Sequence, residues 1–564
     1  MNHRTARLLW PPLGYALVSL IATWPLMTHL HGWVPGSGDW GQNMWALWWT
    51  RYALVALGQH PFYTHYLFYP EGVTLLFHPL DVADGLLALP LYGLLGGDVS
   101  YNLMVLLSFV LGGWGVYLLA LYLTGQRAAA FIAGLIFVLS PYHFLRLDLG
   151  HLNLATLQWI PFYILFLLKF VQQGSRRSAL LAVVCLVFTA LHSWYYVVYC
   201  GLLTLAIWFW PAPRTRFITR LGRTTIVLGA AVVILSPLLV PMVRLLGETT
   251  LVGAHDPLRH SVDLLSFWAP GPPSTWASWF EDVWVAYAAQ HREPGASAYL
   301  GYSVLGLSLI GLLGHARRRQ TLWWLAVALG FALLSLGPQL QIDGRLLDLP
   351  LPYQVLADLL PAFSITGIPG RFVVMTSLAL SLLAAYGLAV LAGRLPSKIT
   401  NSGSVNRPST YLYLAVVLLV GLEYLAVPLR LTRTGVAEFY QQVASEPETY
   451  AVIDLKWDAN FLMHAQTIHG KPLVGGWLAR LPEAQAAYLN QDRLDKAFLY
   501  LLLGPNGANL TDPASVQPAL QAALAERDVR YIIAHDHVAG PWLEEVVGWP
   551  VVYESETLMV YGRP

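Results

Sequence analysis

Long apolar runs recur along the whole chain and limit its fold more than any other feature of the sequence. The hydrocarbon core of a bilayer is ~30 Å thick, so a helix that crosses it needs about 20 apolar residues. Eleven runs approach that length, at 8–28, 101–123, 128–145, 153–171, 179–194, 196–211, 224–244, 299–314, 321–337, 371–392 and 410–427. Charged residues make up 12% of the chain, against about 25% in soluble domains. The sequence therefore predicts an α-helical polytopic membrane protein with about eleven transmembrane helices.

Three of the apolar segments need separate interpretation. The first run, 8–28, is too long for a signal-peptide core and lacks a small-residue cleavage site, so we interpret it as a retained transmembrane helix. The runs 179–194 and 196–211 meet at "LHSWYY", which is either a tight turn or the interior of one long helix. The stretch from Gly85 to Leu95 is too short to span and is assigned to the first large loop.

Basic residues at the ends of the runs predict which loops face the cytoplasm, because Lys and Arg favour that side. They gather in alternate connections, at Arg4, Arg7, Arg127, Lys169, Arg176, Arg177, Arg214, Arg216, Arg220, Arg223, Arg317, Arg318, Arg319, Arg394, Lys398 and Arg407. The intervening loops are longer, yet 29–99 contains Arg51 as its only Lys or Arg. This pattern predicts a cytoplasmic N-terminus and places 29–99, 245–298, 338–370 and everything after 428 outside.

The last part of the chain has a different pattern. Short β-rich runs alternate there with helix-like segments. The clearest runs are "YAVIDL" (450–455), "VRYIIAH" (529–535), "VVYES" (551–555) and "LMVYG" (558–562). We therefore predict two domains, a transmembrane domain at 1–427 with a large first outer loop at 29–99, and an extracytoplasmic α/β domain at 428–564.

Charge balance and cysteine content exclude some classes of function. The 33 Lys and Arg residues nearly balance the 32 Asp and Glu residues, so nothing indicates a nucleic-acid partner. Cys185 and Cys200 both lie in apolar segments, which gives neither a disulfide framework nor a thiolate metal site. The chemistry must therefore come from the few charged residues and their positions.

Asp39 is the first acidic candidate on the predicted outer side. It precedes "NMWALWWTRYALVAL" (43–57), a helix-length segment crowded with tryptophan. Such a helix is expected to lie in the headgroup plane, where indole rings are favoured. Its dipole would stabilise an ionised Asp39 by ~0.3–1 kcal/mol. Asp39 is thus either a helix cap beside an interfacial anchor or a functional carboxylate.

The loop "HPFYTHYLFYPEGVTLLFHPLDVADG" (60–85) is dense in titratable groups. Among them are His60, Tyr63, His65, Tyr69, Glu71, His78, Asp81 and Asp84. Loops with this many such groups often form sites on a rigid scaffold, although an ordinary solvated loop with structural histidines is the alternative. No pair has the spacing of a zinc-binding helix motif, so we predict no dedicated metal site. A carboxylate-bound divalent cation stays an alternative.

Two arginine-containing segments and an aromatic loop complete the outer candidates. The segments "SPYHFLRLDLGHLN" (140–153) and "SITGIPGRF" (364–372) supply His143, Arg146, Asp148, His151 and Arg371. Arginine suits bidentate recognition of phosphate, and the aromatic faces of "FWAPGPPSTWASWFEDVW" (267–284) suit sugar rings. Taken singly, each has a structural alternative, which is snorkelling or helix capping for the arginines and an interfacial belt for the tryptophans.

Five segments carry a resemblance to a known family. They are "GDWGQNMWALWW" (38–49), "LFYPEGVTLLFHPLD" (67–81), "AAAFIAGLIFVLSPYHFLRLDLGHLNL" (128–154), "GIPGRF" (367–372) and "HGKPLVGGWLARLP" (469–482). With the inside N-terminus, the acid early in a long outer loop and the outer C-terminal domain, the chain resembles the GT-C superfamily of polyprenyl-phosphate-sugar-dependent glycosyltransferases. The nearest likeness is to bacterial multi-pass proteins of the YfhO type.

The resemblance implies that the acid of the first outer loop, Asp39, contributes to catalysis. Many members of the superfamily carry two adjacent acids at this point. Here Trp40 follows Asp39, which leaves a second acid to Glu71, Asp81 or Asp84. A metal-dependent form of the reaction is therefore not predicted from the motif.

The resemblance further implies a glycosyltransferase of the bacterial cytoplasmic (inner) membrane, embedded among membrane lipids. It would move a sugar from a polyprenyl-phosphate donor to an acceptor glycan, lipid or protein on the outer face, with inversion at the sugar. Asp39 would be the general base, and the phosphate would be held by Arg371 with Arg146 or His151. Sugar or acceptor would be oriented by Asn43, Tyr69, Glu71, His78 and Asp81.

A transporter or lipid flippase and a non-catalytic membrane scaffold are the alternatives to an enzyme. A transporter should place ionisable groups near the bilayer midplane, often at broken helices with repeat symmetry. The predicted spans show no such symmetry and carry their charges at the outer ends, which favours an enzyme that works at the interface.

Overall fold

The structure of the protein is a computed structural model. It describes residues 3–211, 215–253, 255–288, 298–314, 318–360, 363, 367–394, 407–456, 458–483, 513–535, 544–545 and 547–564. The chain divides into two compact units. The helical unit comprises Met1–Ser37, Val99–Pro237 and Ala254–Thr432, and the mixed unit comprises Gly38–Asp98, Leu238–Gly253 and Arg433–Pro564. Most of the first outer loop thus groups with the C-terminal segment, whereas the sequence analysis assigned it to the transmembrane domain.

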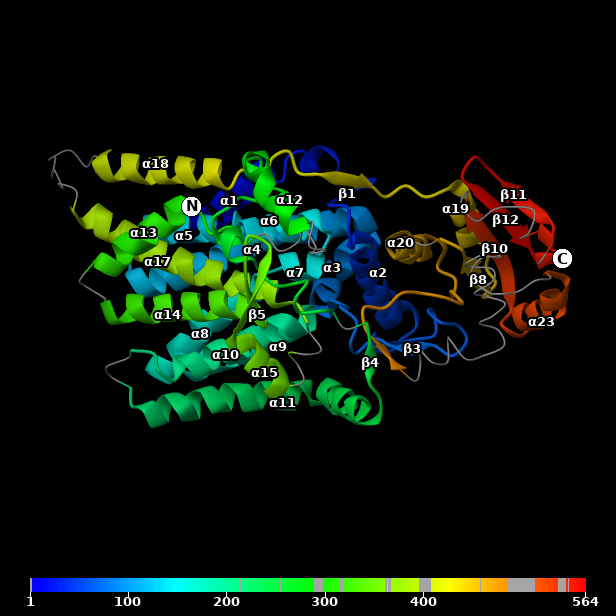
Figure 1. Ribbon diagram of the computed structural model, residues 1–564, viewed down its shortest axis with the longest axis horizontal. Helices are drawn as coiled ribbons and strands as arrows, with labels where there is room; N and C mark the ends of the chain where they lie inside the picture. Colours follow the sequence, from blue (N-terminus) through cyan, green and yellow to red (C-terminus); the bar gives the residue numbers. More distant parts are fainter. Residues whose placement is uncertain are drawn as a thin grey trace. The chain divides into compact units, whose positions relative to one another are not determined.

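Helices lie at each of the eleven positions predicted to span the membrane (Figure 1). They are α1 (His3–Ala22), α4 (Gly97–Thr124), α5 with α6 (Arg127–Val138, Pro141–Asp148), α7 with α8 (Leu152–Ala155, Trp159–Gln173), α9 (Arg176–His192), α10 (Trp194–Ile207), α11 (Phe217–Glu248), α13 (Tyr302–Leu313), α14 (Arg318–Ser335), α17 (Val373–Arg394) and α18 (Arg407–Glu423).

Five helical segments in the described part of the chain are long and apolar enough to cross a membrane. They are Gly97–Thr124, Arg127–Asp148, Leu152–Gln173, Phe217–Glu248 and Pro369–Arg394. The protein is therefore a multi-pass membrane protein, while the number of eleven spans stays a prediction.

The described structure also contains shorter α-helices and twelve strands. They are α2 (Trp40–Arg51), α3 (Val82–Leu95), α12 (Glu281–Ala288), α15 (Pro352–Leu359), α19 (Glu438–Ser445), α20 (Ala459–His469), α23 (Pro513–Glu526), β1 (Trp33–Pro35), β2 (Tyr63–Thr64), β3 (Val73–Thr74), β4 (Leu251–Val252), β5 (Gln339–Ile342), β6 (Arg345–Pro350), β7 (Leu431–Arg433), β8 (Ala451–Asp454), β9 (Leu481–Pro482), β10 (Val529–His535), β11 (Val551–Glu554) and β12 (Leu558–Gly562).

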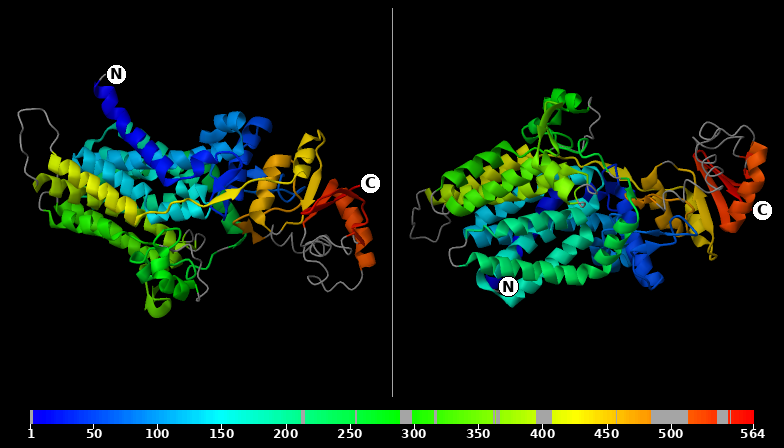
Figure 2. Two further views of the ribbon diagram at one scale, coloured as in Figure 1. Left: turned by 90° about the horizontal axis from the view of Figure 1, so that it is seen from above. Right: turned by 60° about the horizontal axis from the view of Figure 1, so that its bottom comes forward.

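Helix α17 forms the centre of the helical unit. Its residues from Val373 to Leu388 are buried, and it packs against α5, α13 and α14. The crossing with α13 is close, because a Cβ on Gly387 would lie 1.9 Å from the Leu307 carbonyl oxygen and one on Gly311 would lie 2.6 Å from that of Leu383. Small residues let the backbones of membrane helices approach in this way. Figure 2 shows these helices running alongside one another from two further sides.

The structure decides between the two interpretations of "LHSWYY". Helix α9 ends at His192 and α10 begins at Trp194. Ser193 between them is extended, with φ −155° and ψ 123°. The segment is therefore a one-residue break between two helices.

The mixed unit contains a four-stranded sheet in the order β11-β12-β10-β8. Its strands coincide with the four β-rich runs of the sequence. Strands β8 and β10 are parallel, whereas β12 is antiparallel to β10 and to β11. Buried Leu520 and Leu524 of α23 pack with Val529, Ile532 and Tyr561 of the strands to form its core. That this segment is soluble and extracytoplasmic stays a prediction.

Helix α2 lies in the protein interior, which corrects the prediction of a helix in the headgroup plane. Every residue of α2 before Arg51 is buried, and the helix packs against α3 and α20. A Cβ on Gly41 would lie 2.0 Å from the Asn460 carbonyl oxygen, so α2 and α20 cross closely. The Trp45 indole donates to Gln466 Oε1 over 2.7 Å. A protein core and a membrane interface both accept indole rings, and the aromatic pattern did not distinguish them.

Candidate functional site

Two arginines of the helical unit lie close together among tyrosines. Arg146 is in the last turn of α6, and Arg371 is in a short 3-10 helix, η6 (Pro369–Phe372), that leads into α17. The Arg371 guanidinium carbon lies 4.2 Å from the centre of the Tyr195 ring, and that of Arg146 lies 4.9 Å from the centre of the Tyr142 ring. Both distances allow cation–π attraction. We call these two residues the arginine pair.

The arginine pair concentrates positive charge in a place with little water. Each guanidinium lies within electrostatic range of the other. Arg146 is 5% exposed, whereas Arg371 is partly exposed and its buried Nε has no hydrogen-bond partner among the described residues. Like charges repel more strongly where the dielectric is low, so a bound anion relieves this repulsion. The planar fork of arginine matches the oxygens of a phosphate group.

His151 adjoins the pair. Its Nδ1 lies 3.4 Å from Arg146 Nη1. The structure therefore brings together the three residues predicted to bind phosphate, although that role stays a prediction. Asp148, from the same sequence segment, instead forms an ion pair of 2.9 Å with Arg430.

Two histidines of the helical unit have structural partners. His143 is buried and its Nδ1 lies 2.7 Å from the Val138 carbonyl oxygen. His192 Nε2 accepts from the Trp159 indole over 2.7 Å, and its Nδ1 lies 3.1 Å from Thr156 Oγ1. These contacts help to hold both rings in place.

Asp39, in the mixed unit, stands before α2 without capping it. Its side chain makes no capping hydrogen bond, while its backbone carbonyl accepts from the Asn43 amide over 2.8 Å. The side chain is partly exposed, and its charge acts on His78. The cap interpretation is therefore wrong for this side chain, and the role of Asp39 as a base stays a prediction.

His78 is a buried, neutral neighbour of this acid. Burial lowers the pKa of His78 to about 3, against the opposing effect of the Asp39 charge. Its Nδ1 lies 3.5 Å from the Ala479 backbone nitrogen, and the rings of Trp45 and Trp477 lie edge-on at 6.1 and 6.2 Å. The neutral imidazole could therefore donate or accept a hydrogen bond with a ligand without adding a positive charge.

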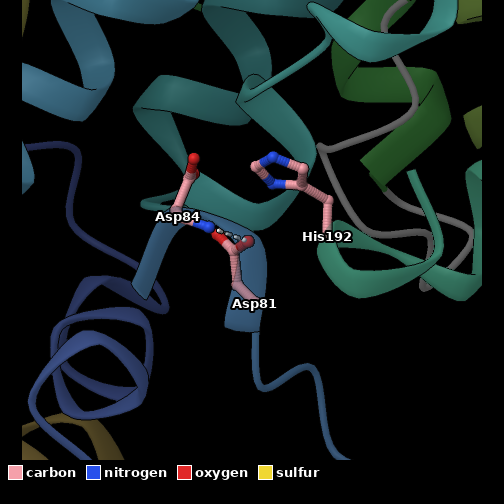
Figure 3. Close-up of side chains that lie close together, drawn as sticks. All are labelled: Asp81, Asp84 and His192. Carbon is pink, nitrogen blue, oxygen red and sulfur yellow. Dashed lines mark hydrogen bonds between the residues drawn. The ribbon is translucent and has the colours of Figure 1, made fainter. Parts of the chain in front are cut away.

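Asp81 and Asp84 bring two buried carboxylates to the start of α3 (Figure 3). Asp81 has a left-handed backbone, with φ 46°, and its carboxylate accepts from the Asp84 backbone N–H over 3.4 Å. Burial raises the pKa of Asp81 to about 7, and hydrogen bonds from Asp84 act in the opposite direction. Mg²⁺ and Ca²⁺ prefer carboxylate oxygens, so these two residues could supply part of the shell of a divalent cation.

Tyr69 and Glu71 are tied to the C-terminal segment of the mixed unit. The Tyr69 N–H donates to the Leu473 carbonyl over 3.0 Å, and its ring packs against the core of the sheet. The Glu71 carboxylate lies 3.9 Å from the Arg527 guanidinium. These contacts give both residues a structural role, and their predicted role in orienting substrate stays untested.

The sequence analysis missed the tyrosines around the arginine pair. Tyr196 and Tyr199 are buried, and the Tyr196 hydroxyl lies 3.0 Å from that of Tyr142. A signal was present, because Tyr195, Tyr196 and Tyr199 occupy neighbouring positions on the first turns of α10, directly after the break at Ser193.

Solved membrane glycosyltransferases have a similar fold. The oligosaccharyltransferase AglB from Archaeoglobus fulgidus, solved with an inhibitory peptide and a dolichol-phosphate, aligns over 93% of this chain and 69% of its own, with 12% identity and a TM-score of 0.50. The arabinofuranosyltransferase AftD from Mycobacteria aligns over 100% of this chain with 15% identity and a TM-score of 0.55. The chain spans only 42% of the length of AftD. The chain thus shares the fold of these glycosyltransferases, as its resemblance to the GT-C superfamily predicts, whereas the likeness to YfhO-type proteins stays a prediction.

Comparison of sequences gives the family. No curated protein matches the chain. A family model described as Domain of unknown function (DUF6311) matches residues 12–420, which is most of the sequence. The protein therefore belongs to the DUF6311 family.

Proposed function

We propose that the protein is a membrane glycosyltransferase that moves a sugar from a polyprenyl-phosphate donor to an acceptor on the outer face of a bacterial cytoplasmic membrane. The observation that carries this proposal is the arginine pair, with Arg146 buried and Arg371 partly exposed beside tyrosine rings. The GT-C fold supports it, and AglB was solved with a dolichol-phosphate.

The arginine pair suits the charge that this reaction develops. When the sugar leaves, the polyprenyl phosphate gains a second negative charge, and a catalyst stabilises that charge with fixed positive groups out of water. Arg371 is partly exposed, and Arg146 holds a second guanidinium within electrostatic range of it. His151 adds a third polar group beside Arg146.

Asp39 is the proposed general base. Its carboxylate would take the proton of an acceptor hydroxyl while the hydroxyl oxygen attacks the anomeric carbon and the bond to the phosphate oxygen breaks. One base and one direct displacement give inversion at the sugar. Asp39 directly precedes the N-terminus of α2, and a helix dipole favours negative charge at that end. The nearby Asn43 and His78, together with Asp81, are proposed to orient sugar or acceptor hydroxyls.

The proposal is tested with full-length protein in nanodiscs and a panel of radiolabelled undecaprenyl-phosphate sugars. We expect Asp39→Asn to lower transfer about 10²–10⁴-fold while it keeps its affinity for undecaprenyl phosphate. Arg371→Ala should lose that affinity. Arg430→Gln is the control, because Arg430 is an exposed arginine paired with Asp148, and it should keep both properties.

Two results would contradict the proposal. Full transfer by Asp39→Asn would remove Asp39 from the mechanism. Movement of the lipid across the bilayer without transfer of its sugar would instead identify a flippase.

A further inference from the structure

Helix α15 lies beside the last turn of α14 in the helical unit. The Leu351 N–H, directly before α15, donates to the Pro338 carbonyl over 2.9 Å, and the two helices pack against each other. The exposed face of α14 carries large apolar side chains as far as this end, at Leu322, Leu329 and Leu333. In a multi-pass membrane protein, an apolar face of this kind contacts lipid. Helix α15 therefore lies where the lipid-facing surface of α14 ends.

Helix α15 exposes an apolar stripe and a polar stripe side by side. Val355 and Leu359, which are one turn apart, are 57% and 70% exposed. Gln354 and Asp358 form the neighbouring stripe, where Gln354 Nε2 donates to Asp358 Oδ1 over 2.7 Å. The opposite face carries Tyr353, which is buried. A helix divided in this way suits the boundary between an apolar and a polar medium.

The hairpin of β5 and β6 carries apolar side chains on both of its faces. Leu346 and Leu347 of β6 are exposed, and successive residues of a strand point to opposite faces. A protein partner would cover one face, whereas a surrounding medium meets both. Within the described residues no third strand pairs with β6, and open sheet edges do not occur in the hydrocarbon core of a membrane. The hairpin therefore suits the headgroup region, where water reaches its free edge.

We propose that α15 and the hairpin of β5 and β6 lie in the headgroup region of the membrane, with Val355 and Leu359 directed toward the acyl chains. The partner is a lipid surface, and the inference needs neither donor nor acceptor, so it goes beyond the proposed function. Arg345 and Asp348 of β6 are exposed. They match the phosphate and the ammonium group of a zwitterionic headgroup.

The buried face of α15 connects this membrane contact to the arginine pair. The Tyr353 hydroxyl donates to the Phe363 carbonyl over 3.1 Å. The Tyr353 ring also lies 6.4 Å from the ring of Phe372, the residue that follows Arg371. Because α15 packs against this segment, the depth of α15 in the membrane fixes the depth at which Arg371 lies.

Site-specific fluorescence tests whether the apolar stripe meets lipid. Val355→Cys, Leu359→Cys and Gln354→Cys are made in the full-length protein and labelled with the environment-sensitive dye NBD. Each is reconstituted in nanodiscs of palmitoyl-oleoyl phosphatidylcholine, with or without a doxyl-labelled phosphatidylcholine that quenches the dye from within the acyl-chain region. Wild type is the labelling blank, because Cys185 and Cys200 are buried.

Val552→Cys is the matched control. Val552 of β11 is 52% exposed, close to the exposure of Val355, but it belongs to the four-stranded sheet of the mixed unit. Its label should emit as in water and should not respond to the doxyl lipid.

We expect the labels at positions 355 and 359 to emit at shorter wavelength than the label at 354. The doxyl lipid should lower their emission about twofold, since the apolar face of an interfacial helix lies ~5–10 Å into the boundary between headgroups and acyl chains. Leu359→Cys decides the matter if Val355→Cys fails to fold.

Three results would overturn the proposal. The first is water-like emission from both labels of the apolar stripe. The second is equal quenching of the label at Val552. The third is emission at short wavelength without quenching by the doxyl lipid, and in particles of twice the chain mass this would identify a second copy of the chain as the partner of α15.

Discussion

Replacing Asp81 with asparagine should stabilise the mixed unit at alkaline pH and change little near pH 4. Asp81 is buried at the start of α3, and burial raises its pKa to about 7. Asparagine has the same shape, can accept the same hydrogen bond from Asp84 and tolerates the left-handed backbone at φ 46°. The substitution therefore removes the cost of ionising a buried carboxylate and alters little else.

The sign and size of the effect follow from the pKa of this carboxyl group. A raised pKa means that the folded protein binds the proton more tightly than the unfolded chain, where the pKa is about 3.8. The protonated carboxyl group therefore makes its full contribution to the free energy of unfolding below pH 4, and this contribution is lost as the pH rises through 7. The difference of about three pKa units between the folded and unfolded states corresponds to ~4 kcal/mol of unfolding free energy. About 2–3 kcal/mol of this stability is lost between pH 5 and pH 8. For a unit of roughly 200 residues, this is on the order of 5–10 °C in Tm.

The assay is thermal unfolding of the full-length protein in detergent with EDTA, followed by tryptophan fluorescence from pH 5 to pH 8. Asp458→Asn is the control, because Asp458 caps α20 through the Asn460 N–H at 3.0 Å and is exposed to solvent. We expect the Tm of Asp81→Asn to rise relative to wild type as the pH increases, and that of Asp458→Asn to show no such trend. A Tm difference between Asp81→Asn and wild type that is the same at pH 5 and pH 8 would refute the reasoning.

Three further outcomes are expected. Gly41→Ala should lower the free energy of unfolding by about 1–3 kcal/mol, because the added Cβ would lie 2.0 Å from the Asn460 carbonyl oxygen. Gly435→Ala is the control, because a Cβ at Gly435 would have no heavy atom within 4 Å. Equal Tm values for the two variants would contradict the close crossing. Arg371→Lys should bind undecaprenyl phosphate on the order of tenfold more weakly in native mass spectrometry, since lysine keeps the charge but loses the planar fork over Tyr195; wild-type affinity would contradict this. Alkaline phosphatase fused after the last residue should be active in bacterial cells and a green fluorescent protein fusion dark, and the reverse result would place the C-terminal segment in the cytoplasm.

The positions of helices and strands could be predicted because their cause is local. An apolar run long enough to cross a bilayer is visible in the sequence, and so is the alternation of the strands in the mixed unit. Close helix crossings are not local. Gly311 and Gly387 allow α13 and α17 to pack closely. The sequence around each glycine does not indicate which helix it will contact.

The candidate site was predictable residue by residue but not as an arrangement. Arg146 and Arg371 could be predicted as candidate phosphate-binding residues because each places a charge at the end of an apolar run. Their proximity and the tyrosines around them arise from packing between helices distant in sequence. Tyr196 and Tyr199 sit in an apolar helix, where a tyrosine has the pattern of an ordinary core residue. The helix-cap interpretation of Asp39 failed because residue type and position do not fix where a carboxylate points.

The pairing of α2 with α20 has a consequence for the order of events during synthesis. Trp45 and its partner Gln466 are 421 positions apart, and a ribosome adds about 5–20 residues per second. The tryptophan-rich helix must therefore wait about 20 to 80 seconds for the segment that buries it. During that interval the headgroup region is the environment that its indole rings favour. We therefore expect the nascent chain to keep α2 at the membrane surface and to withdraw it into the protein only when α20 arrives.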